Sequence, residues 1–282
     1  MKFGVHVSVA GGIHLGLKRA AEIGCETAQF FLGNPRGWHS PPLTADEIER
    51  FLSVREKEAK DIRPLAAHIP YLPNLASLDE KIRLKSVLTL RDNLERCEAL
   101  TIDFLVTHLG KSKEPDAEQR MVECIVQAYD DKRYGVCLLL ENTAGQGSET
   151  GFQLPDLAKL YAMIPNDISK GICLDTCHAF AAGYEIGSKS GFKQVLRELN
   201  QTIGFKEVKL LHVNDSLKPL GSRVDRHAQI GAGHIGLEGF RTLFSHPLIR
   251  SLPGILEIPR KTIAEDVEQL KLVRSLAAKP CK

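Results

Sequence analysis

The feature of this sequence that most constrains its fold is a repeated alternation of short apolar runs with longer amphipathic stretches. Each of eight strand-like runs is followed by a stretch with helical periodicity. The expected strands are residues 3–8, 27–32, 64–69, 104–110, 136–142, 171–178, 208–215 and 254–259. The expected helices are residues 12–24, 44–60, 78–100, 116–132, 154–164, 191–204, 237–248 and 264–278.

Eight strand–helix units within 282 residues predict an α/β fold of the (β/α)₈ TIM-barrel class. An open doubly wound sheet is the alternative. That fold usually carries G-x-G-x-x-G after its first strand, and the VSVAGGI segment lacks this spacing. Because no linker or low-complexity tract interrupts the pattern, we expect residues 1–282 to form a single (β/α)₈-barrel domain.

The composition is that of an ordinary globular protein, with 43% hydrophobic and 26% charged residues. No apolar run approaches the roughly 20 residues that span a bilayer, and the N-terminus is a poor signal peptide. We therefore expect a cytoplasmic protein without membrane contact. The seven scattered cysteines favour reduced, mostly buried thiols over a disulfide framework. A net charge of +2 neither supports nor excludes DNA as a partner.

The expected strands end in residues that bind metals. From the third strand to the eighth, the end residues are His68, His108, Glu141, Asp175, His212 and Glu257, with His178 and Asp215 three residues beyond two of them. A lone histidine in a strand is more often a packed side chain than a ligand. Active sites of these barrels lie at the carboxyl ends of the strands, and carboxylates that end apolar runs are costly to bury unpaired. The set as a whole therefore indicates a metal centre.

The GSRVDRH segment after the seventh strand adds Asp225 and His227. In an extended segment residues i and i+2 point the same way, so both could reach one ion. With His178 they would form a three-ligand site with nitrogen and oxygen donors and an open position, as catalytic zinc sites require. A surface salt-bridge patch of Arg223, Asp225 and Arg226 is the alternative, and the spacing alone does not decide between them.

Several longer motifs resemble the signature blocks of endonuclease IV, the zinc-dependent apurinic/apyrimidinic endonuclease family. These motifs are HVSVAGG, NPRGW, HIPYLPNL, LENTAGQGS, CLDTCHAFAAGY, HVNDS, GSRVDRHAQIGAGHIG and the late LE pair. They cover essentially the whole chain in the expected order. The resemblance implies hydrolysis of the phosphodiester bond 5′ to abasic sites in duplex DNA, leaving a 3′-hydroxyl and a 5′-deoxyribose phosphate. It also implies trimming of blocked 3′ ends.

The resemblance further implies three zinc ions (Zn²⁺) per chain. The first would be held by His68, His108 and Glu141, and the third by His178, Asp225 and His227. The second would take Glu141 as a bridge together with Asp175, His212 and Glu257. Zinc lowers the pKa of bound water from about 15.7 toward 7, which would supply the nucleophile. Glu257 and Glu141 are the expected catalytic residues, with Glu257 orienting or deprotonating that nucleophile, and Asp215 is assigned to a supporting or structural role.

By the same resemblance, Arg36, Tyr71 and Leu72 are expected to bind DNA by entering it at the lesion. Unstacking a nucleotide costs least where the base is already missing. The alternative is ordinary loop packing for Tyr71 and Leu72 and an acidic partner for Arg36. Two departures from the family pattern stand near these residues. Ile258 replaces the threonine expected before Pro259, and Gly37 replaces a longer polar residue.

Two other functions compete with this interpretation. A sugar isomerase or epimerase on a related barrel also carries carboxylate and histidine ligands, but its sites bind manganese or magnesium mainly through carboxylates. A non-catalytic zinc-stabilised DNA-binding protein would have closed, cysteine-rich sites, whereas this set of residues is free of cysteine. We expect a monomer, because eight helices that close a barrel leave no obligatory apolar face.

Overall fold

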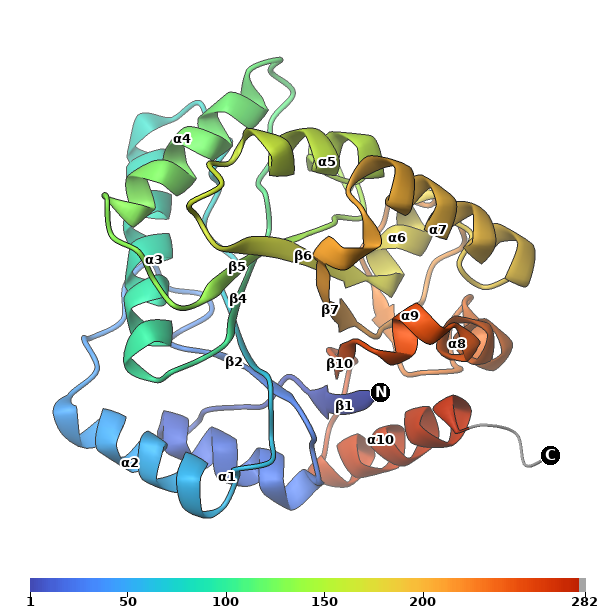
Figure 1. Cartoon of the computed structure of the whole chain (residues 1–282), viewed down its shortest axis with the longest axis horizontal. Helices are drawn as coiled ribbons and strands as arrows, with labels where there is room; N and C mark the ends of the chain where they lie inside the picture. The colour runs from blue at the N-terminus through green and yellow to red at the C-terminus, as the bar shows by residue number, and fades with distance from the viewer. Residues whose placement is uncertain (279–282) are drawn as a thin grey trace.

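The computed structural model describes residues 1–278, and its centre is one eight-stranded parallel sheet. The strands are β1 (Lys2–Val5), β2 (Ala28–Phe31), β3 (Leu65–His68), β4 (Phe104–Thr107), β5 (Cys137–Glu141), β6 (Lys170–Asp175), β7 (Val208–His212) and β10 (Pro253–Leu256). Figure 1 shows them as a ring, with neighbours in chain order except that β10 joins β7 to β1. The parallel bridge between His6 and Gln29 closes the ring between β1 and β2. The predicted (β/α)₈ barrel is therefore confirmed.

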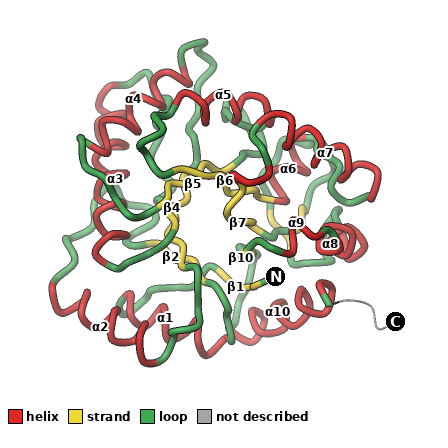
Figure 2. Tube along the Cα trace, in the orientation of Figure 1, coloured by secondary structure: helices red, strands yellow, loops and turns green. Residues whose placement is uncertain are grey.

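The helices surround this ring on its outside, as the tube in Figure 2 shows. They are α1 (Ile13–Ile23), α2 (Ala45–Lys57), α3 (Glu80–Ala99), α4 (Ala117–Tyr129), α5 (Leu154–Met163), α6 (Thr176–Ala182), α7 (Lys189–Thr202), α8 (Gly236–Ser245), α9 (Pro247–Arg250) and α10 (Ile263–Ala277), with a 3₁₀ turn, η1 (Phe205–Glu207). Local signals start several of them. Thr44 and Glu47 form a capping box at α2, and Thr262 caps α10 by accepting from Glu265 N.

Two hydrophobic layers follow from the alternation of side chains along each strand. One set of strand residues, such as Phe3 and Phe30, packs outward against the helices. The opposite set fills the inside of the barrel: Ala66, Val106, Leu139, Cys173, Leu210 and Ile255. Each of these six precedes a predicted ligand by two residues, and residues two apart in a strand share a face. The strands therefore direct the predicted ligands inward at the carboxyl end of the barrel.

The structure adds detail to the local predictions in three places. The sixth strand ends at Asp175, its predicted end residue, and the rest of the run 171–178 enters α6, because the Asp175 carboxylate accepts from His178 N. The helix expected over 237–248 is divided into α8 and α9, because Pro247 has no N–H to continue α8. The loop after β7 contains a short antiparallel hairpin of β8 (Asp215–Ser216) and β9 (His227–Ala228) that was not predicted.

The six cysteines among residues 1–278 are free thiols, five of them buried, as expected. The seventh, Cys281, lies outside the described residues. Within residues 1–278 we find no helix that is long and apolar enough to cross a membrane.

Candidate metal centre

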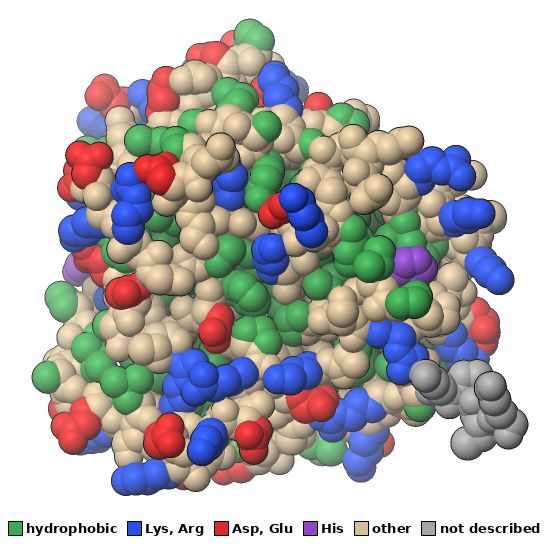
Figure 3. Space-filling model, viewed as in Figure 1, with side chains coloured by type: hydrophobic (Ala, Val, Ile, Leu, Met, Phe, Trp, Pro, Cys, Tyr) green, Lys and Arg blue, Asp and Glu red, His purple; other side chains and the backbone are tan. Residues whose placement is uncertain are grey.

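The predicted ligands gather around a pocket at one end of the barrel. The pocket has a volume of about 430 Å³ and is lined by His6, Phe31, His68, Tyr71, His108, His178, Asp225, Arg226, His227, Glu257, Ile258, Pro259 and Arg260. The face drawn in Figure 3 is a different one, since no histidine is visible at its centre, where hydrophobic side chains gather. The pocket combines imidazoles, carboxylates and two arginines. The imidazoles and carboxylates suit metal cations, and the arginines suit an anion bound beside those cations.

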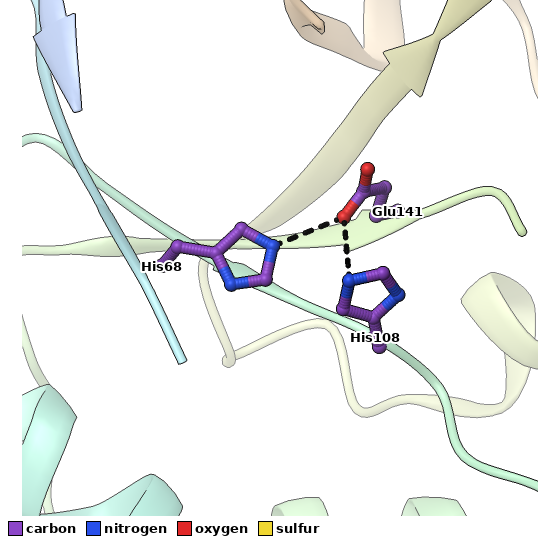
Figure 4. Close-up of side chains that lie close together, drawn as sticks. All are labelled: His68, His108 and Glu141. Carbon is purple, nitrogen blue, oxygen red and sulfur yellow. Dashed lines mark hydrogen bonds and ion pairs between the residues drawn. The ribbon is translucent and has the colours of Figure 1, made fainter. Parts of the chain in front are cut away.

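His68, His108 and Glu141 form the first group whose donor atoms lie within 4.8 Å of one another. They come from the ends of β3, β4 and β5. Both imidazoles direct Nε2 toward the same carboxylate oxygen, Glu141 Oε2, at 3.2 Å from His68 and 3.5 Å from His108 (Figure 4). Two nitrogens and one oxygen that converge on one point are an arrangement that zinc accepts.

The second group contains Glu141, Asp175, His212 and Glu257. His212 Nδ1 lies 2.9 Å from Glu141 Oε1 and 3.1 Å from Glu257 Oε2. It lies 3.8 Å from Asp175 Oδ2. Because Glu141 directs one oxygen into each of the first two groups, it is positioned to bridge two cations.

The third group, His178, Asp225 and His227, lies beside the barrel strands. His178 is on α6, while the β8–β9 hairpin brings in the other two. Asp225 Oδ1 is 3.4 Å from His178 Nε2 and 3.3 Å from His227 Nε2. The DRH segment was expected to be extended, and it is extended at β9. The alternative was a surface salt-bridge patch of Asp225 with its arginine neighbours. Asp225 instead faces two imidazoles.

Each of four imidazoles has one ring nitrogen within hydrogen-bond distance of a carbonyl or amide oxygen, although the anchored nitrogen of His178 also lies 3.4 Å from Glu141 Oε1. His68 Nδ1 lies 2.7 Å from Ile69 O, His178 Nδ1 2.9 Å from Asn142 O, and His227 Nδ1 3.0 Å from Glu257 O. His212 Nε2 lies 2.9 Å from Gln29 Oε1. An N–H donated to these oxygens leaves the other nitrogen as a lone pair that faces carboxylates. Within residues 1–278, buried His227 Nε2 has no hydrogen-bond partner. These lone pairs fit a bound cation.

The pKa shifts of the clustered side chains also indicate that the carboxylates are stabilised by nearby positive charge. Burial by itself would raise the pKa of Glu141, but His108 and His212 outweigh it and hold the pKa well below its usual range. Burial lowers the pKa of His108 to about 4. Burial opposes a charge on His227 as well, but Asp225 and Asp175 raise its pKa to about 9. Ionised carboxylates without a cation thus draw protons onto their neighbours, and divalent ions would replace those protons.

Three buried amides support the cluster, and the sequence analysis missed them. Asn214 Nδ2 donates to Asp175 Oδ2 at 2.6 Å, and Asn214 Oδ1 accepts from Glu257 N at 2.8 Å. Asn142 Oδ1 accepts from Asp175 N. The third amide is Gln29, on β2. Asn142 directly follows the ligand Glu141 in LEN, and Asn214 stands two residues after the ligand His212 in HVND, so the sequence offered a signal for both. Gln29 has no ligand beside it in the sequence and offered no such signal.

Asp215 belongs to none of the groups of converging donor atoms found among residues 1–278. Its buried carboxylate accepts hydrogen bonds from the backbone N–H groups of Gly231, Gly233 and Ile235 at 2.9, 3.0 and 2.9 Å. Of the two roles left open for it, this geometry supports the structural one, because it ties the loop before α8 to β8.

One cysteine borders the cluster, contrary to the expectation of a cysteine-free site. The Sγ atom of buried Cys177 lies within 4.8 Å of a donor atom of Asp175 and of His227. The thiol's pKa is raised to about 12 by burial. Cys177 follows Asp175 by two residues, but since it lies on α6, strand alternation gave no reason to place it here.

The three residues expected to contact DNA lie on exposed loops, and Tyr71 lines the pocket. Tyr71 is 64% exposed, and its ring packs on Phe31 at 5.2 Å between centroids. Leu72 is 37% exposed. Arg36 is exposed and forms no ion pair within the described part of the chain, so the acidic partner offered as an alternative is absent there. Tyr71 N donates to Pro35 O, which joins the two loops.

Of the departures from the family pattern, Ile258 is buried and lines the pocket. Two other groups contact the Glu257 carboxylate near it: Gln29 Nε2 at 2.6 Å and His6 Nδ1 at 3.1 Å from Oε1. The carboxylate is therefore hydrogen-bonded although Ile258 has no hydroxyl. Gly37 follows Arg36 in a turn closed by Gly37 N and Asn34 O.

Comparison with known proteins places these observations in context. A family model described as xylose isomerase-like TIM barrel matches residues 17–276. A probable endonuclease 4 of Chloroflexus aurantiacus is 41% identical over 280 residues, covering 98% of each chain. The crystal structure of endonuclease IV from Thermus thermophilus is similar with a TM-score of 0.86 and 34% identity, covering 98% of both chains. A D-tagatose 3-epimerase-like protein, at 21% identity and a TM-score of 0.69, covering 98% of this chain and 97% of that one, shares the fold alone.

Proposed function

Because this chain belongs to the endonuclease IV family, we propose that it hydrolyses the phosphodiester bond 5′ to abasic sites in duplex DNA with three zinc ions. The products are a 3′-hydroxyl and a 5′-deoxyribose phosphate, and the same site trims blocked 3′ ends. The enzyme acts as a monomer in the cytoplasm.

One observation carries the proposal. Nine side chains that are scattered along the chain form three groups of donor atoms, and the distal nitrogens of four imidazoles are anchored so that lone pairs face the carboxylates. His68 and His108 would hold the first ion with Glu141. Asp175, His212, Glu257 and the other oxygen of Glu141 would hold the second, and His178, Asp225 and His227 the third. The mixed nitrogen and oxygen donors suit zinc.

When bound, zinc would lower the pKa of a water molecule and draw negative charge from the phosphate oxygens. The protein's own residues do the remaining work. Glu257, at the pocket wall, orients the attacking water and takes its proton as the water oxygen bonds to phosphorus. The bond from phosphorus to the 3′ oxygen breaks, and that oxygen leaves as the 3′-hydroxyl after gaining a proton. Arg226, exposed at the pocket, can bind a phosphate of the same strand.

Lesion recognition follows from the loops around the pocket. Tyr71 and Leu72 expose apolar surface next to the cluster, and Arg36 adds an exposed positive charge. Apolar wedges that enter duplex DNA must offset the cost of unstacking, and this cost is lowest where a base is missing. We propose that these three residues enter the duplex at the abasic nucleotide and leave its phosphate at the pocket.

The test is a nicking assay on a labelled duplex with one abasic site, with the metal content measured on the same sample. We expect incision 5′ to the lesion, about three zinc ions per chain, and a loss of at least about 100-fold in rate in Glu257→Gln. Glu22→Gln, an exposed change on α1, should behave as the wild type. Bound metal with turnover of an aldose or ketose and no incision would instead favour a sugar isomerase or epimerase.

A further inference from the structure

Gln29 lies at a junction between two of the proposed ligands. It is fully buried on β2, and its amide sits between His212 and Glu257. Gln29 Oε1 is 2.9 Å from His212 Nε2, and Gln29 Nε2 is 2.6 Å from Glu257 Oε1. Neither partner is near it in sequence, since the two are 183 and 228 residues away.

The chemistry of the two partners fixes which way this amide points. An ionised carboxylate only accepts hydrogen bonds, so the amide NH₂ must face Glu257 and the amide oxygen must face His212. His212 Nε2 must then carry a proton that it donates to Gln29. His212 Nδ1 is left to face Glu141 Oε1 at 2.9 Å and Glu257 Oε2 at 3.1 Å. A cation bound by these residues would relieve the contact of the Nδ1 lone pair with two carboxylates.

His212 differs in this respect from the other anchored imidazoles. Backbone carbonyls anchor His68, His178 and His227, and no substitution removes a carbonyl. Only a side chain anchors His212. The same side chain also holds Glu257, so the second group depends on Gln29 at two of its donors. Among the described residues, the ligands of the first and third groups form no hydrogen bond with the Gln29 side chain.

We propose that Gln29 is a positioning residue of the second metal group: it fixes His212 with Nδ1 as the ligand atom and aims the Glu257 carboxylate. This inference rests on the proposed function only in taking the second group as a metal site. It requires no particular DNA substrate. Gln29 does not line the pocket, so it acts through its two neighbours and does not touch DNA.

Two substitutions separate the two contacts. Gln29→Met keeps roughly the size of the side chain and removes the hydrogen bonds to His212 and Glu257, together with the 3.0 Å contact of Gln29 Nε2 with His6 Nδ1. Gln29→Glu keeps an acceptor for His212 Nε2 but places a second carboxylate against Glu257. Thr27→Val is the matched control: Thr27 is buried on the same face of the same segment, and its hydroxyl donates to Pro64 O at 2.6 Å without touching the cluster.

The first readout is zinc binding by the full-length protein in competition with a chelator. In Gln29→Met we expect one of three zinc ions to bind about 10- to 100-fold more weakly, with the other two unchanged. Gln29→Glu should weaken the same ion. Thr27→Val should lose thermal stability but keep all three affinities. Equal weakening of all three ions in Gln29→Met, or no difference from Thr27→Val, would overturn the proposal.

The second readout is the ring tautomer of His212, measured by ¹⁵N NMR of the zinc-loaded protein. The wild type and Gln29→Glu should show an exchange-protected proton on Nε2, and Gln29→Met should lose it. This readout stays informative if Gln29→Met folds poorly, because a wild-type His212 protonated on Nδ1 would contradict the proposal directly. A protein that binds three zinc ions but does not cut abasic DNA would refute the proposed function and leave both readouts for Gln29 intact.

Discussion

For a single histidine, the decisive property is which ring nitrogen is anchored. His178 shows this clearly, since Nδ1 lies 2.9 Å from Asn142 O and Nε2 lies 3.4 Å from Asp225 Oδ1. Without a cation, burial opposes the charge on His178, but Asp175 and Asp225 outweigh it and raise the pKa well above its usual value. The imidazole holds a proton in the metal-free protein and would exchange it for a metal under our proposal, and these two states would respond to pH in opposite ways.

This alternation predicts how the stability of the metal-free protein depends on pH. The pKa of His227 is about 9 in the fold and about 6.5 in an unfolded chain. Its imidazolium therefore stabilises the metal-free fold fully below pH 6.5, and this stabilisation is lost as the pH rises through 9. The raised pKa of His178 acts in the same direction. The lowered pKa of His108, about 4, changes the stability of the metal-free fold only below pH 6.5.

We therefore expect the Tm measured with EDTA to fall between pH 6.5 and 9. Zinc-loaded protein should lack this decline, because its coordinated imidazoles are already neutral. The difference in Tm between the two samples should widen over this range, as differential scanning calorimetry can measure. Parallel curves would mean that these histidines do not exchange protons for metal.

At the scale of elements, the third group depends on parts added to the barrel. α6 begins directly at Asp175, and the β8–β9 hairpin is held by Asp215, which accepts hydrogen bonds from the loop at Gly231 and Gly233. The loop passes close to β8, since a Cβ on Gly233 would collide with Ser216 O and lie 2.5 Å from Asp215 Oδ1. A side chain cannot be added here without moving the hairpin.

Gly233→Ala should therefore destabilise the fold by about 1–3 kcal/mol and displace the hairpin. We expect it to weaken the ion of the third group before the other two, as zinc competition would reveal. Gly135→Ala is the control, because its Cβ would meet nothing closer than 3.4 Å. Its free energy of unfolding should stay within about 0.5 kcal/mol of the wild type. Unchanged zinc affinities in Gly233→Ala would show that the hairpin does not depend on this close approach.

At the scale of the whole molecule, the barrel closes where its first two strands meet. β1 and β2 are joined by the bridge at His6 and Gln29, and Val7 N donates to Gln29 O at 2.8 Å. Closure brings the backbones very close, because a Cβ on Gly4 would collide with the carbonyl oxygen of Thr27. The seam also carries two of the side chains that contact Glu257, namely His6 and Gln29, so barrel closure and the geometry of the second group are coupled.

Gly4→Ala should separate this seam, with a loss of about 3 kcal/mol or more, since the colliding atom belongs to the backbone. Native-state hydrogen exchange should show faster exchange at Val7 and Gln29 than in the wild type, while β5 and β6 remain protected. Gly135→Ala again serves as the control. Uniformly faster exchange in all strands would mean that the barrel opens as one unit and has no weak seam.

The prediction of one domain over residues 1–282 stays a prediction.

The sequence by itself determined the barrel and the residue types at its rim. Both are local properties: strands alternate with helices, and ligands such as His68 and Glu141 stand two residues after inward-facing apolar residues. The motifs also carried the division of the ligands into three sets through their resemblance to a known family. Periodicity could not have supplied that division, because it places side chains on a face and does not pair them across the barrel.

Only the tertiary structure decided which atoms meet. Gln29 is an unremarkable polar residue in a strand until closure places it against His212 and Glu257, far along the chain. Cys177 enters the cluster because Asp175 starts a helix, and Asp215 leaves it because its carboxylate binds backbone N–H groups. Each outcome depends on hydrogen bonds between distant segments, and such bonds have no signature in the local pattern from which secondary structure is read.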